Sequence, residues 1–428
     1  MPSSSESGLH PENGSADPRL RAATALARVD ADRAHAARLL GGAVPAEREL
    51  VLGVLRWQLT LDHLLLRHLK QPVAGHDPAV RAVLRVGLYE ALRMRTPVPV
   101  AVAEAVRVAK RLAPRAAGLV NAVLRRASGE RWPDPADPGT PASVRFSHPE
   151  WLVERWRRLL GEGDLLAALA SDQEPAPLYL LAAASHCEEL AAAGCRLAPH
   201  AAVPGVVAVT AGTEAAVAAL QAGRAYAIDP TAVAVARLLP PAAGLTVDLA
   251  AAPGGKSLVL ACERRHPRLL SADRNLGRTV MMRRNLAAVA SAPAVAVADA
   301  TAPPLRPGSC AAVLVDAPCS GTGTLRRHPE IRWRLRESDL GALAAAQRRI
   351  VESAAALLAP GGFLLYATCS LEPEENAGVL DGVALEVVPV GPLLPRGLPR
   401  RELPSGGAVI PPDALGDGFT VHLLRRLA

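Results

Sequence analysis

Hydrophobic and polar positions follow a helical pattern through the first third of the chain. In residues 79–95 apolar side chains recur with a period of about 3.6 residues, and arginines fall on another face. The apolar positions are Val80, Val83, Leu84, Leu88, Ala91 and Leu92, and the arginines are Arg81, Arg85 and Arg93. Residues 49–69, 102–112 and 116–127 are similarly rich in helix formers. The pattern predicts an all-helical domain over residues 19–128 with an arginine-rich exterior.

The pattern changes at Leu245, where short apolar runs begin to end in acidic or small residues. The runs are LTVDLA, RLLSAD, AVAVAD, AAVLVDAP and GGFLLYATC, and segments of helix length separate them. Strands that alternate with helices predict an α/β domain over residues 241–428, with a mostly parallel sheet covered on both faces. Residues 416–427 resemble a closing strand, antiparallel to GGFLLYATC. Ligands of such sheets bind beyond the carboxyl ends of the strands.

Three further segments complete the expected organisation. Residues 1–18 are polar and have no apolar core, which predicts a disordered tail rather than a targeting signal. Residues 129–145 are rich in Pro, Gly and Asp and are expected to be a linker. Residues 146–240 combine an amphipathic segment with two apolar runs, APLYLLAAA and GVVAVTA, and predict a small α+β subdomain.

Positive charge is concentrated in the predicted helical domain. From Arg19 to Arg126 there are 19 Lys and Arg against 8 Asp and Glu, a net charge of +11, while the whole chain carries +7. Such a basic segment favours an anionic partner, most simply a nucleic acid. A solvated helical surface is the alternative that charge alone leaves open.

The six cysteines show neither C-x-x-C spacing nor a paired histidine motif, so we expect no metal site. Scattered cysteines in a long chain without a signal peptide predict a cytoplasmic protein with reduced thiols. No charge-free apolar run has the length and flanks of a membrane span, and we expect a monomer with no membrane association.

A glycine loop, DLAAAPGGKS at 248–257, follows the first predicted strand. A Walker A motif requires glycine where Ala250 stands, and G-x-G-x-x-G is also absent, which excludes the dehydrogenase fingerprint. Small residues before a helix still allow close approach of a ligand. Asp273 ends the next strand, where nucleotide-binding folds place a carboxylate for ribose, and Asp299 ends the third, within reach of an adenine amino group. A plain turn with solvated aspartates is the alternative.

Two cysteines, Cys319 in DAPCSGTG and Cys369 in ATCSLEPEEN, stand just past strand ends beside small residues. The remaining four are expected to be small core residues: Cys187, Cys195, Cys262 and Cys310. Pro373 and the two glutamates after it have the composition of a helix start. A helix N-terminus there would favour a thiolate at Cys369, and the glutamates would oppose it.

Two thiols beside a nucleoside-bearing cofactor fit one reaction well. A thiolate that adds to carbon 6 of a pyrimidine gives carbon 5 carbanion character, so that carbon 5 can take a methyl group from a sulfonium donor. A second group then removes the carbon 5 proton and the first thiolate leaves. Asp316, expected at a strand end, could hydrogen-bond N3 and the exocyclic amine of cytosine. The base must be unpaired or flipped. Position alone does not decide which cysteine is the nucleophile.

DLAAAPGGKS, DAPCSGTGTLRRHPEIRW and YATCSLEPEEN resemble the motifs of the RNA (cytosine-C5) methyltransferases of the RsmB/NOP2/Sun family. LVLGVLRW, VLRVGLYEALRM and GLVNAVLRR are similar to the NusB-like RNA-binding domain, which occurs in a bacterial member that acts on 16S rRNA. The resemblance covers about residues 19–128 and 225–426. It implies a class I, Rossmann-like methyltransferase domain, S-adenosyl-L-methionine as cofactor and ribosomal RNA, 16S rRNA in particular, as partner.

The resemblance also implies roles for single residues. Cys369 of the T-C-S motif would be the nucleophile, and Cys319 of the D-A-P-C-S motif would assist product release. The cofactor would contact Ala250, Ala251, Ala252, Pro253, Gly254, Gly255, Lys256, Asp273, Asp299 and Asp316. Three departures stand out: Leu181 and Ala183 replace the Arg and Asn of PLYLRVN, IDPTA (228–232) replaces QDEAS, and Ala250 stands where a cysteine is frequent.

Two other functions compete with this hypothesis. An RNA-binding or antitermination-type factor could carry an inert methyltransferase domain, although the intact cysteine pair and cofactor loop argue against it. A small-molecule methyltransferase would leave the +11 helical domain unexplained. Binding of S-adenosyl-L-methionine separates the first alternative from the enzyme.

Overall fold

The computed structural model describes residues 17–287, 289 and 291–427, and its contacts divide the chain into two compact units, 1–148 and 149–428. The predicted tail lies outside the described residues as far as residue 16. The first helix begins at Pro18, one residue before the predicted boundary, and the Asp17 side chain caps it by accepting from the backbone N–H of Arg19. In the described part of the chain, no helix is both long and apolar enough to span a bilayer.

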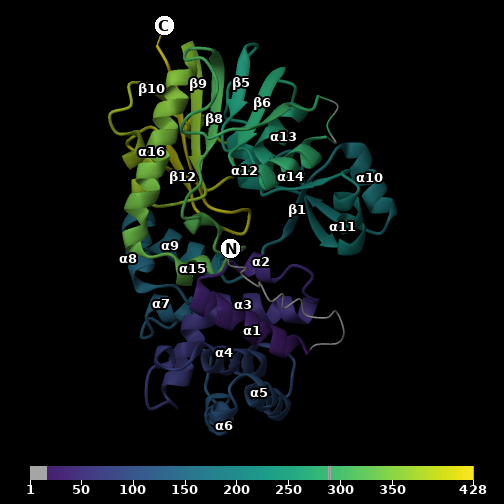
Figure 1. The fold of residues 1–428 in the computed structure, drawn as a ribbon, viewed down its shortest axis with the longest axis vertical. Coiled ribbons are helices and arrows are strands. Elements are labelled where there is room, and N and C mark those ends of the chain that lie inside the picture. Colours follow the sequence, from purple (N-terminus) through teal and green to yellow (C-terminus); the bar gives the residue numbers. More distant parts are fainter. Residues whose placement is uncertain (1–16, 288, 290, 428) are drawn as a thin grey trace, which may run out of the picture. The chain divides into compact units, whose positions relative to one another are not determined.

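The first unit is all-helical in its described residues, as predicted (Figure 1). Leu84 and Leu88 are fully buried on the apolar face of α4. The elements are α1 (Pro18–Asp32), α2 (Ala36–Leu39), α3 (Pro45–Leu66), η1 (Val73–Gly75), α4 (Pro78–Arg93), α5 (Val98–Leu112), η2 (Pro114–Ala116), α6 (Ala117–Ala127) and α7 (Ala142–Arg145).

The expectation of an arginine-rich exterior is wrong for Arg85. Only 6% of Arg85 is exposed, and its guanidinium forms ion pairs with Asp62 at 2.8 Å and Asp30 at 3.0 Å. Arg81 also pairs with Asp30, at 2.8 Å, and Arg93 stacks over the Trp57 ring. The acidic partners come from other helices, so helical period alone could not show that Arg81 and Arg85 are engaged inside the fold; Arg93 is exposed, as expected.

The second unit opens with α8 (Glu150–Leu160) and α9 (Glu162–Ser171), which precede a small antiparallel sheet of order β2-β3-β1-β4. Both apolar runs of the predicted α+β region form strands, β1 (Leu178–Leu181) and β3 (Val206–Ala211). The other elements are α10 (Ala184–Ala192), β2 (Arg196–Pro199), α11 (Thr213–Gln221) and β4 (Tyr226–Ala227). The α+β character of this segment is confirmed.

A nine-stranded sheet forms the rest of this unit, in the order β11-β12-β13-β9-β8-β5-β6-β7 with β10 paired to β13. The pairs among β5 to β9 are parallel, and β13 is antiparallel to β9, as expected for the closing strand. The strands are β5 (Leu245–Asp248), β6 (Arg268–Asp273), β7 (Ala294–Val297), β8 (Cys310–Asp316), β9 (Leu358–Thr368), β10 (Glu386–Val388), β11 (Arg401–Glu402), β12 (Ala408–Ile410) and β13 (Phe419–Arg425).

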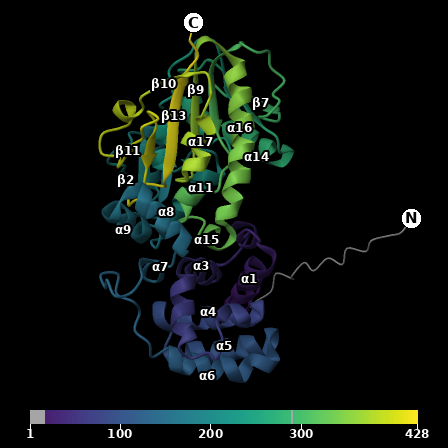
Figure 2. The same cartoon turned by 90° about the vertical axis from the view of Figure 1, so that its left-hand side faces the viewer.

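Helices cover both faces of this sheet. They are α12 (Pro230–Ala236), α13 (Gly255–Cys262), α14 (Leu276–Leu286), α15 (Ile331–Arg334), α16 (Leu340–Leu357) and α17 (Ala377–Leu380), with short turns η3 (Thr322–Thr324), η4 (Glu337–Asp339), η5 (Pro373–Glu375) and η6 (Gly391–Leu393). Figure 2 shows α16 running along the sheet. The mostly parallel, doubly covered sheet that the sequence predicts is confirmed.

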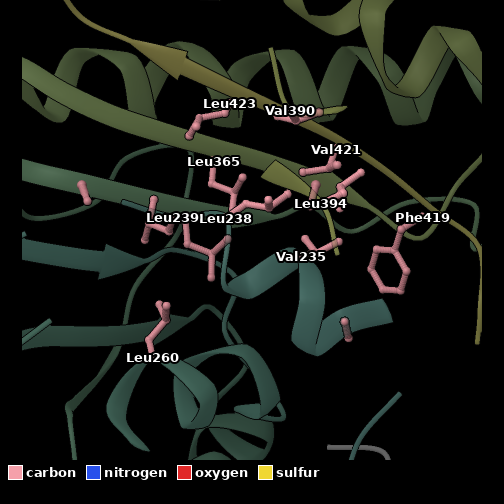
Figure 3. Packing of buried hydrophobic residues seen from close by; sticks show 14 of the residues in the cluster. Val235, Leu238, Leu239, Leu260, Leu365, Val390, Leu394, Phe419, Val421 and Leu423 are labelled. Atoms are coloured by element: carbon pink, nitrogen blue, oxygen red, sulfur yellow. The ribbon is translucent and has the colours of Figure 1, made fainter. Parts of the chain in front are cut away.

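The core of the sheet has two halves because successive strand residues point to opposite faces. On one face Leu314 and Leu365 pack with Leu238 and Leu260 from the α12 and α13 side (Figure 3). On the other face Val313 packs with Val351 of α16. Burial on both faces fixes the register of β8 and β9, and it therefore fixes where each strand ends.

Candidate active site at the carboxyl edge of the sheet

Parallel strands bring the predicted functional residues to one edge of the sheet. Asp248, Asp273 and Asp316 are the last residues of β5, β6 and β8, and Cys369 directly follows β9. Asp299 lies two residues beyond the end of β7. The sheet thus gathers at its carboxyl edge side chains that are more than a hundred residues apart in sequence.

The two strand-end cysteines are in direct contact. Cys319 Sγ lies 3.3 Å from Cys369 Sγ, close enough for one thiol to donate a hydrogen bond to the other sulfur. Backbone bonds hold the two loops together, because Ala317 N–H donates to the Ala367 carbonyl and Gly323 N–H donates to the Cys369 carbonyl, each at 2.9 Å. Both thiols therefore lie at the same point of the sheet edge, which is the arrangement that a two-thiol mechanism needs.

The core interpretation of the other cysteines is correct for Cys195 and Cys310, which are buried, and wrong for Cys262, which is exposed. Cys187 is half-buried. Cys262 is the last residue of α13, where the helix leaves the sheet and its side chain reaches solvent.

Glu375 joins the two cysteine loops. Its side chain is fully buried and accepts four hydrogen bonds: from the backbone N–H of Ser320 at 2.8 Å, the Ser320 hydroxyl at 2.5 Å, the Ser370 hydroxyl at 2.6 Å and the Gln347 amide at 2.9 Å. Ser320 follows Cys319, and Ser370 follows Cys369. One carboxylate therefore connects the residues next to both thiols.

The segment after Cys369 differs from the expected helix. Pro373–Glu375 forms only a three-residue 3₁₀ turn before the four-residue α17. So short a turn has no appreciable macrodipole, and the expected helix-end stabilisation of a thiolate is wrong. Instead, Asn376 fixes this segment: its amide accepts from the Thr368 hydroxyl at 2.6 Å and donates to the carbonyls of Ser370 and Glu372.

Helix α8 fastens the same segment from outside the sheet. Arg155 Nε pairs with the buried Glu372 carboxylate at 2.7 Å, and Trp156 Nε1 donates to its other oxygen at 3.1 Å. Arg155 also pairs with Glu374. Burial raises the pKa of Glu372, whereas hydrogen bonds from Arg155 and Trp156 act in the opposite direction. These contacts hold the loop that carries Cys369.

The electrostatic environment favours the protonated thiol at Cys319. The hydrogen bond with Cys369 is the main cause that raises the pKa of Cys319, followed by burial and by the negative charges of Glu375 and Asp316. A Cys319 thiol can then donate to the Cys369 sulfur and leave that sulfur as the acceptor.

The loop that precedes α13 is held from behind by the protein. The Pro253 carbonyl accepts from Asn285 Nδ2 at 2.8 Å and from the Tyr226 hydroxyl at 3.4 Å. Gly254 has φ +105°, and an added Cβ would meet Met282 at 3.1 Å. At Gly255 an added Cβ would meet Ile228 at 3.1 Å. Close packing against the protein's own side chains is thus one reason for both glycines, and close approach of a ligand to this loop stays a prediction.

Beyond this loop, carboxylates end the next two strands. Asp273 Oδ1 accepts from the Asn275 N–H at 2.9 Å, and Asp299 Oδ1 accepts from Thr301 N and Oγ1, each at 2.8 Å. Asp273 Oδ2 lies 3.9 Å from Arg278 Nη2, and Asp299 has its second oxygen besides; such acceptors suit ribose hydroxyls and an amino group. Together with the N-terminus of α13, they fit the nucleoside and carboxylate of S-adenosyl-L-methionine.

Lys256 ends the loop in the first turn of α13, and its side chain pairs with the end of β8. Its Nζ donates to Asp316 Oδ2 at 2.6 Å and stands 4.7 Å from the centroid of the Phe419 ring. The loop and the second half of the site are thus joined by an ion pair. Nothing in the sequence indicated that Lys256 would pair with Asp316 or that Arg155 would contact the site. For Glu375, the acidic cluster in LEPEEN was a signal that could have been followed.

The parallel sheet, its glycine loop and its strand-end carboxylates define the second unit as a class I methyltransferase that uses S-adenosyl-L-methionine. Residues 235–422 match the family model described as 16S rRNA methyltransferase RsmB/F, and residues 17–128 match the NusB family.

Two relatives match most of the chain. Ribosomal RNA small subunit methyltransferase B of Thermus thermophilus is 35% identical over 387 residues, covering 88% of this chain and 87% of the relative. The protein of the same name from Salmonella paratyphi C is 33% identical over 393 residues, covering 87% and 88%. The chain belongs to the RsmB/F family of rRNA methyltransferases, which confirms the resemblance read from its motifs.

The crystal structure of PH0851 has the same fold, with a TM-score of 0.76 and 23% identity, and the match covers 96% of this chain and all of that one. The family matches assign the NusB-like domain and the methyltransferase domain to the two regions that the order of helices and strands also distinguishes.

Proposed function

We propose that the protein methylates carbon 5 of a cytosine in 16S rRNA through a covalent adduct with Cys369. Membership of the RsmB/F family supports rRNA methylation, and the 3.3 Å contact between Cys319 Sγ and Cys369 Sγ carries the proposal of covalent chemistry. Six free cysteines fit a reducing cytoplasm, where rRNA is made.

In the proposed reaction the Cys369 thiolate adds to carbon 6, forming an S–C bond and placing the electron pair on carbon 5. When bound, S-adenosyl-L-methionine supplies the methyl group that carbon 5 takes. Cys319 then accepts the carbon 5 proton, the electrons of that C–H bond restore the ring double bond, and the S–C6 bond breaks to regenerate the Cys369 thiolate.

Asp316 is proposed to select cytosine. Its carboxylate stands at the end of β8, next to the cysteine pair, and can accept from the exocyclic amine, while Lys256 holds it in place at 2.6 Å. The proposed contacts of the cofactor are the loop Ala250–Lys256 through its backbone, Asp273 toward ribose and Asp299 toward adenine.

Binding of the RNA backbone is assigned to the helical unit. Exposed cations lie on α5, η2 and α6: Lys110, Arg111, Arg115, Arg125 and Arg126. Contacts from such side chains to phosphates make affinity fall as salt rises. The base itself must leave its stack to reach a site built at a sheet edge.

Single cysteine variants test the mechanism with 16S rRNA transcript and labelled S-adenosyl-L-methionine. Cys369→Ala should abolish both methylation and the covalent complex. Cys319→Ala should let the complex accumulate, seen as a shifted band on a denaturing gel, because the carbon 5 proton stays in place. Cys262→Ala, at an exposed thiol away from the pair, is the matched control and should behave as wild type. Full methylation by Cys369→Ala would refute the proposal.

The modified position can be found by bisulfite sequencing of rRNA from cells with and without the gene. A cytosine that resists conversion only when the gene is present identifies the target. If no cytosine differs, the proposed cytosine-C5 activity toward rRNA is wrong.

A further inference from the structure

Glu375 occupies a position that the proposed reaction has not yet used. It is fully buried, and all four of its hydrogen bonds come from donors, two to each oxygen: Ser320 N and Gln347 Nε2 to Oε1, and the Ser320 and Ser370 hydroxyls to Oε2. The backbone N–H of Ser320 and the amide of Gln347 can only donate to Oε1. The structure thus places a buried carboxyl group beside the cysteine pair.

The same carboxylate determines where both thiols lie. Ser320 and Ser370 each follow a cysteine, and the two hydroxyls are themselves 3.0 Å apart. Gln347, from α16, donates to the Pro318 carbonyl at 3.0 Å as well as to Glu375, so the residue before Cys319 is tied to the same point. The two loops belong to different strands, and Glu375 is the side chain that bonds to both.

We propose that Glu375 is a positioning residue for the reaction, which holds the two sulfur atoms in contact and whose charge keeps Cys319 as the protonated partner until Cys369 has reacted. The catalytic role of Glu375 rests on the proposed covalent mechanism. The geometry and protonation of the thiol pair can be measured without RNA.

The charged and titratable groups around Cys319 support this order of events. They are Cys369 on the β9 loop, Glu375 on η5, Asp316 at the end of β8 and Tyr366 within β9, with Lys256 from α13 paired to Asp316. The hydrogen bond with Cys369 is the largest cause of the raised Cys319 pKa.

That largest cause disappears during the proposed reaction. Once the Cys369 sulfur is bonded to carbon 6 it is an uncharged thioether, and the pKa of Cys319 falls. Cys319 can then release its proton to solvent water and, as a thiolate, act as the base. Glu375 sets how far the pKa falls, because its negative charge remains. Adduct formation itself would thus switch Cys319 from hydrogen-bond donor to proton acceptor.

The test is the pH dependence of alkylation at Cys319, followed by mass spectrometry of the peptide in the full-length protein with iodoacetamide. We expect the alkylation midpoint to move to lower pH by roughly one unit in Glu375→Gln, because a like charge is removed. Cys369→Ala should lower the midpoint in the same sense, because the largest cause is removed. Glu352→Gln, exposed on α16, is the matched control and should leave the midpoint unchanged.

Glu375→Asp keeps the carboxylate but shortens the side chain, so it separates the effect of charge from the effect of side-chain length. It also provides a test if the glutamine variant does not fold. The negative charge remains beside Cys319, while the shorter side chain breaks the bridge and should slow adduct formation on RNA at least tenfold. An unchanged midpoint in folded Glu375→Gln, or wild-type adduct formation in Glu375→Asp, would overturn the proposal. The alkylation result does not depend on RNA, so it can fail while the proposed methylation stands.

Discussion

Asp248 is a buried acid whose ionisation should make the stability of the catalytic unit depend on pH. It is fully buried at the end of β5, and its Oδ2 accepts from the Ser257 hydroxyl at 2.7 Å. Burial raises the pKa of Asp248 from 3.8 to about 7, against the opposing hydrogen bond from Ser257.

The sign follows from comparing the two states. The folded pKa lies above the unfolded pKa, so the folded state resists ionisation. The contribution of Asp248 to stability is full below pH 3.8 and is lost as pH rises toward 7. The raised pKa corresponds to roughly 4 kcal/mol in all, of which about 3 kcal/mol falls between pH 5 and pH 8.5.

Asp248→Asn removes the ionisation and keeps an oxygen that can accept from Ser257. Relative to wild type, its free energy of unfolding should therefore rise by about 3 kcal/mol between pH 5 and pH 8.5. Urea unfolding followed by pulsed hydrogen exchange of peptides from residues 245–273 reports on this unit alone. Asp417, whose pKa burial also raises to about 7, titrates in both proteins and cancels in the difference.

The exposed Asp164→Asn is the control and should change nothing with pH. If the difference between Asp248→Asn and wild type stayed constant from pH 5 to pH 8.5, the assignment of a raised pKa to Asp248 would be wrong.

Two substitutions of buried ion pairs follow from the same structure. Arg155→Ala leaves the buried Glu372 carboxylate without its cation and should cost the second unit about 3 kcal/mol in urea unfolding, while Arg158→Ala, exposed on the same helix, should cost less than about 0.5 kcal/mol; equal effects would contradict the role of the pair. Arg85→Ala leaves Asp30 and Asp62 facing a buried gap and should cost the helical unit about 3 kcal/mol, with the exposed Arg125→Ala as control, and a loss below about 1 kcal/mol would show that water replaces the guanidinium.

The sequence predicted the strands of the parallel sheet and which residues stand at their carboxyl ends. Strand-length apolar runs that alternate with helix-length segments are compatible with few folds other than an α/β sheet. Asp248, Asp273, Asp316 and Cys369 were placed at strand ends from runs that stop at an acid or a small residue, and parallel pairing puts such ends at one edge. The roles of the individual site residues remain predictions.

Contacts between distant segments could not be predicted in this way. Arg155 and Glu372 are 217 residues apart, and nothing in the helical period of α8 indicates its partner. Local signals also misled: Pro373 and the glutamates after it read as a helix start, whereas Glu375 is drawn to the serine hydroxyls and Glu374 to Arg155, which leaves a single turn. Tertiary hydrogen bonds won over local propensity.

The pairing of arginines inside the helical unit changes what a charge-reversal scan of this protein would measure. Arg19, Arg81 and Arg85 are bonded to Glu90, Asp30 and Asp62 within that unit. Reversing one of these charges sets like charges against each other in a packed interior, so lost RNA binding would report unfolding. Reversal at Lys110 or Arg126, exposed on α5 and α6, disturbs only the surface. Net charge therefore overstates the number of cations available to phosphate. An RNA-contact surface deduced from such a scan is meaningful only at cations that form no ion pair within the helical unit.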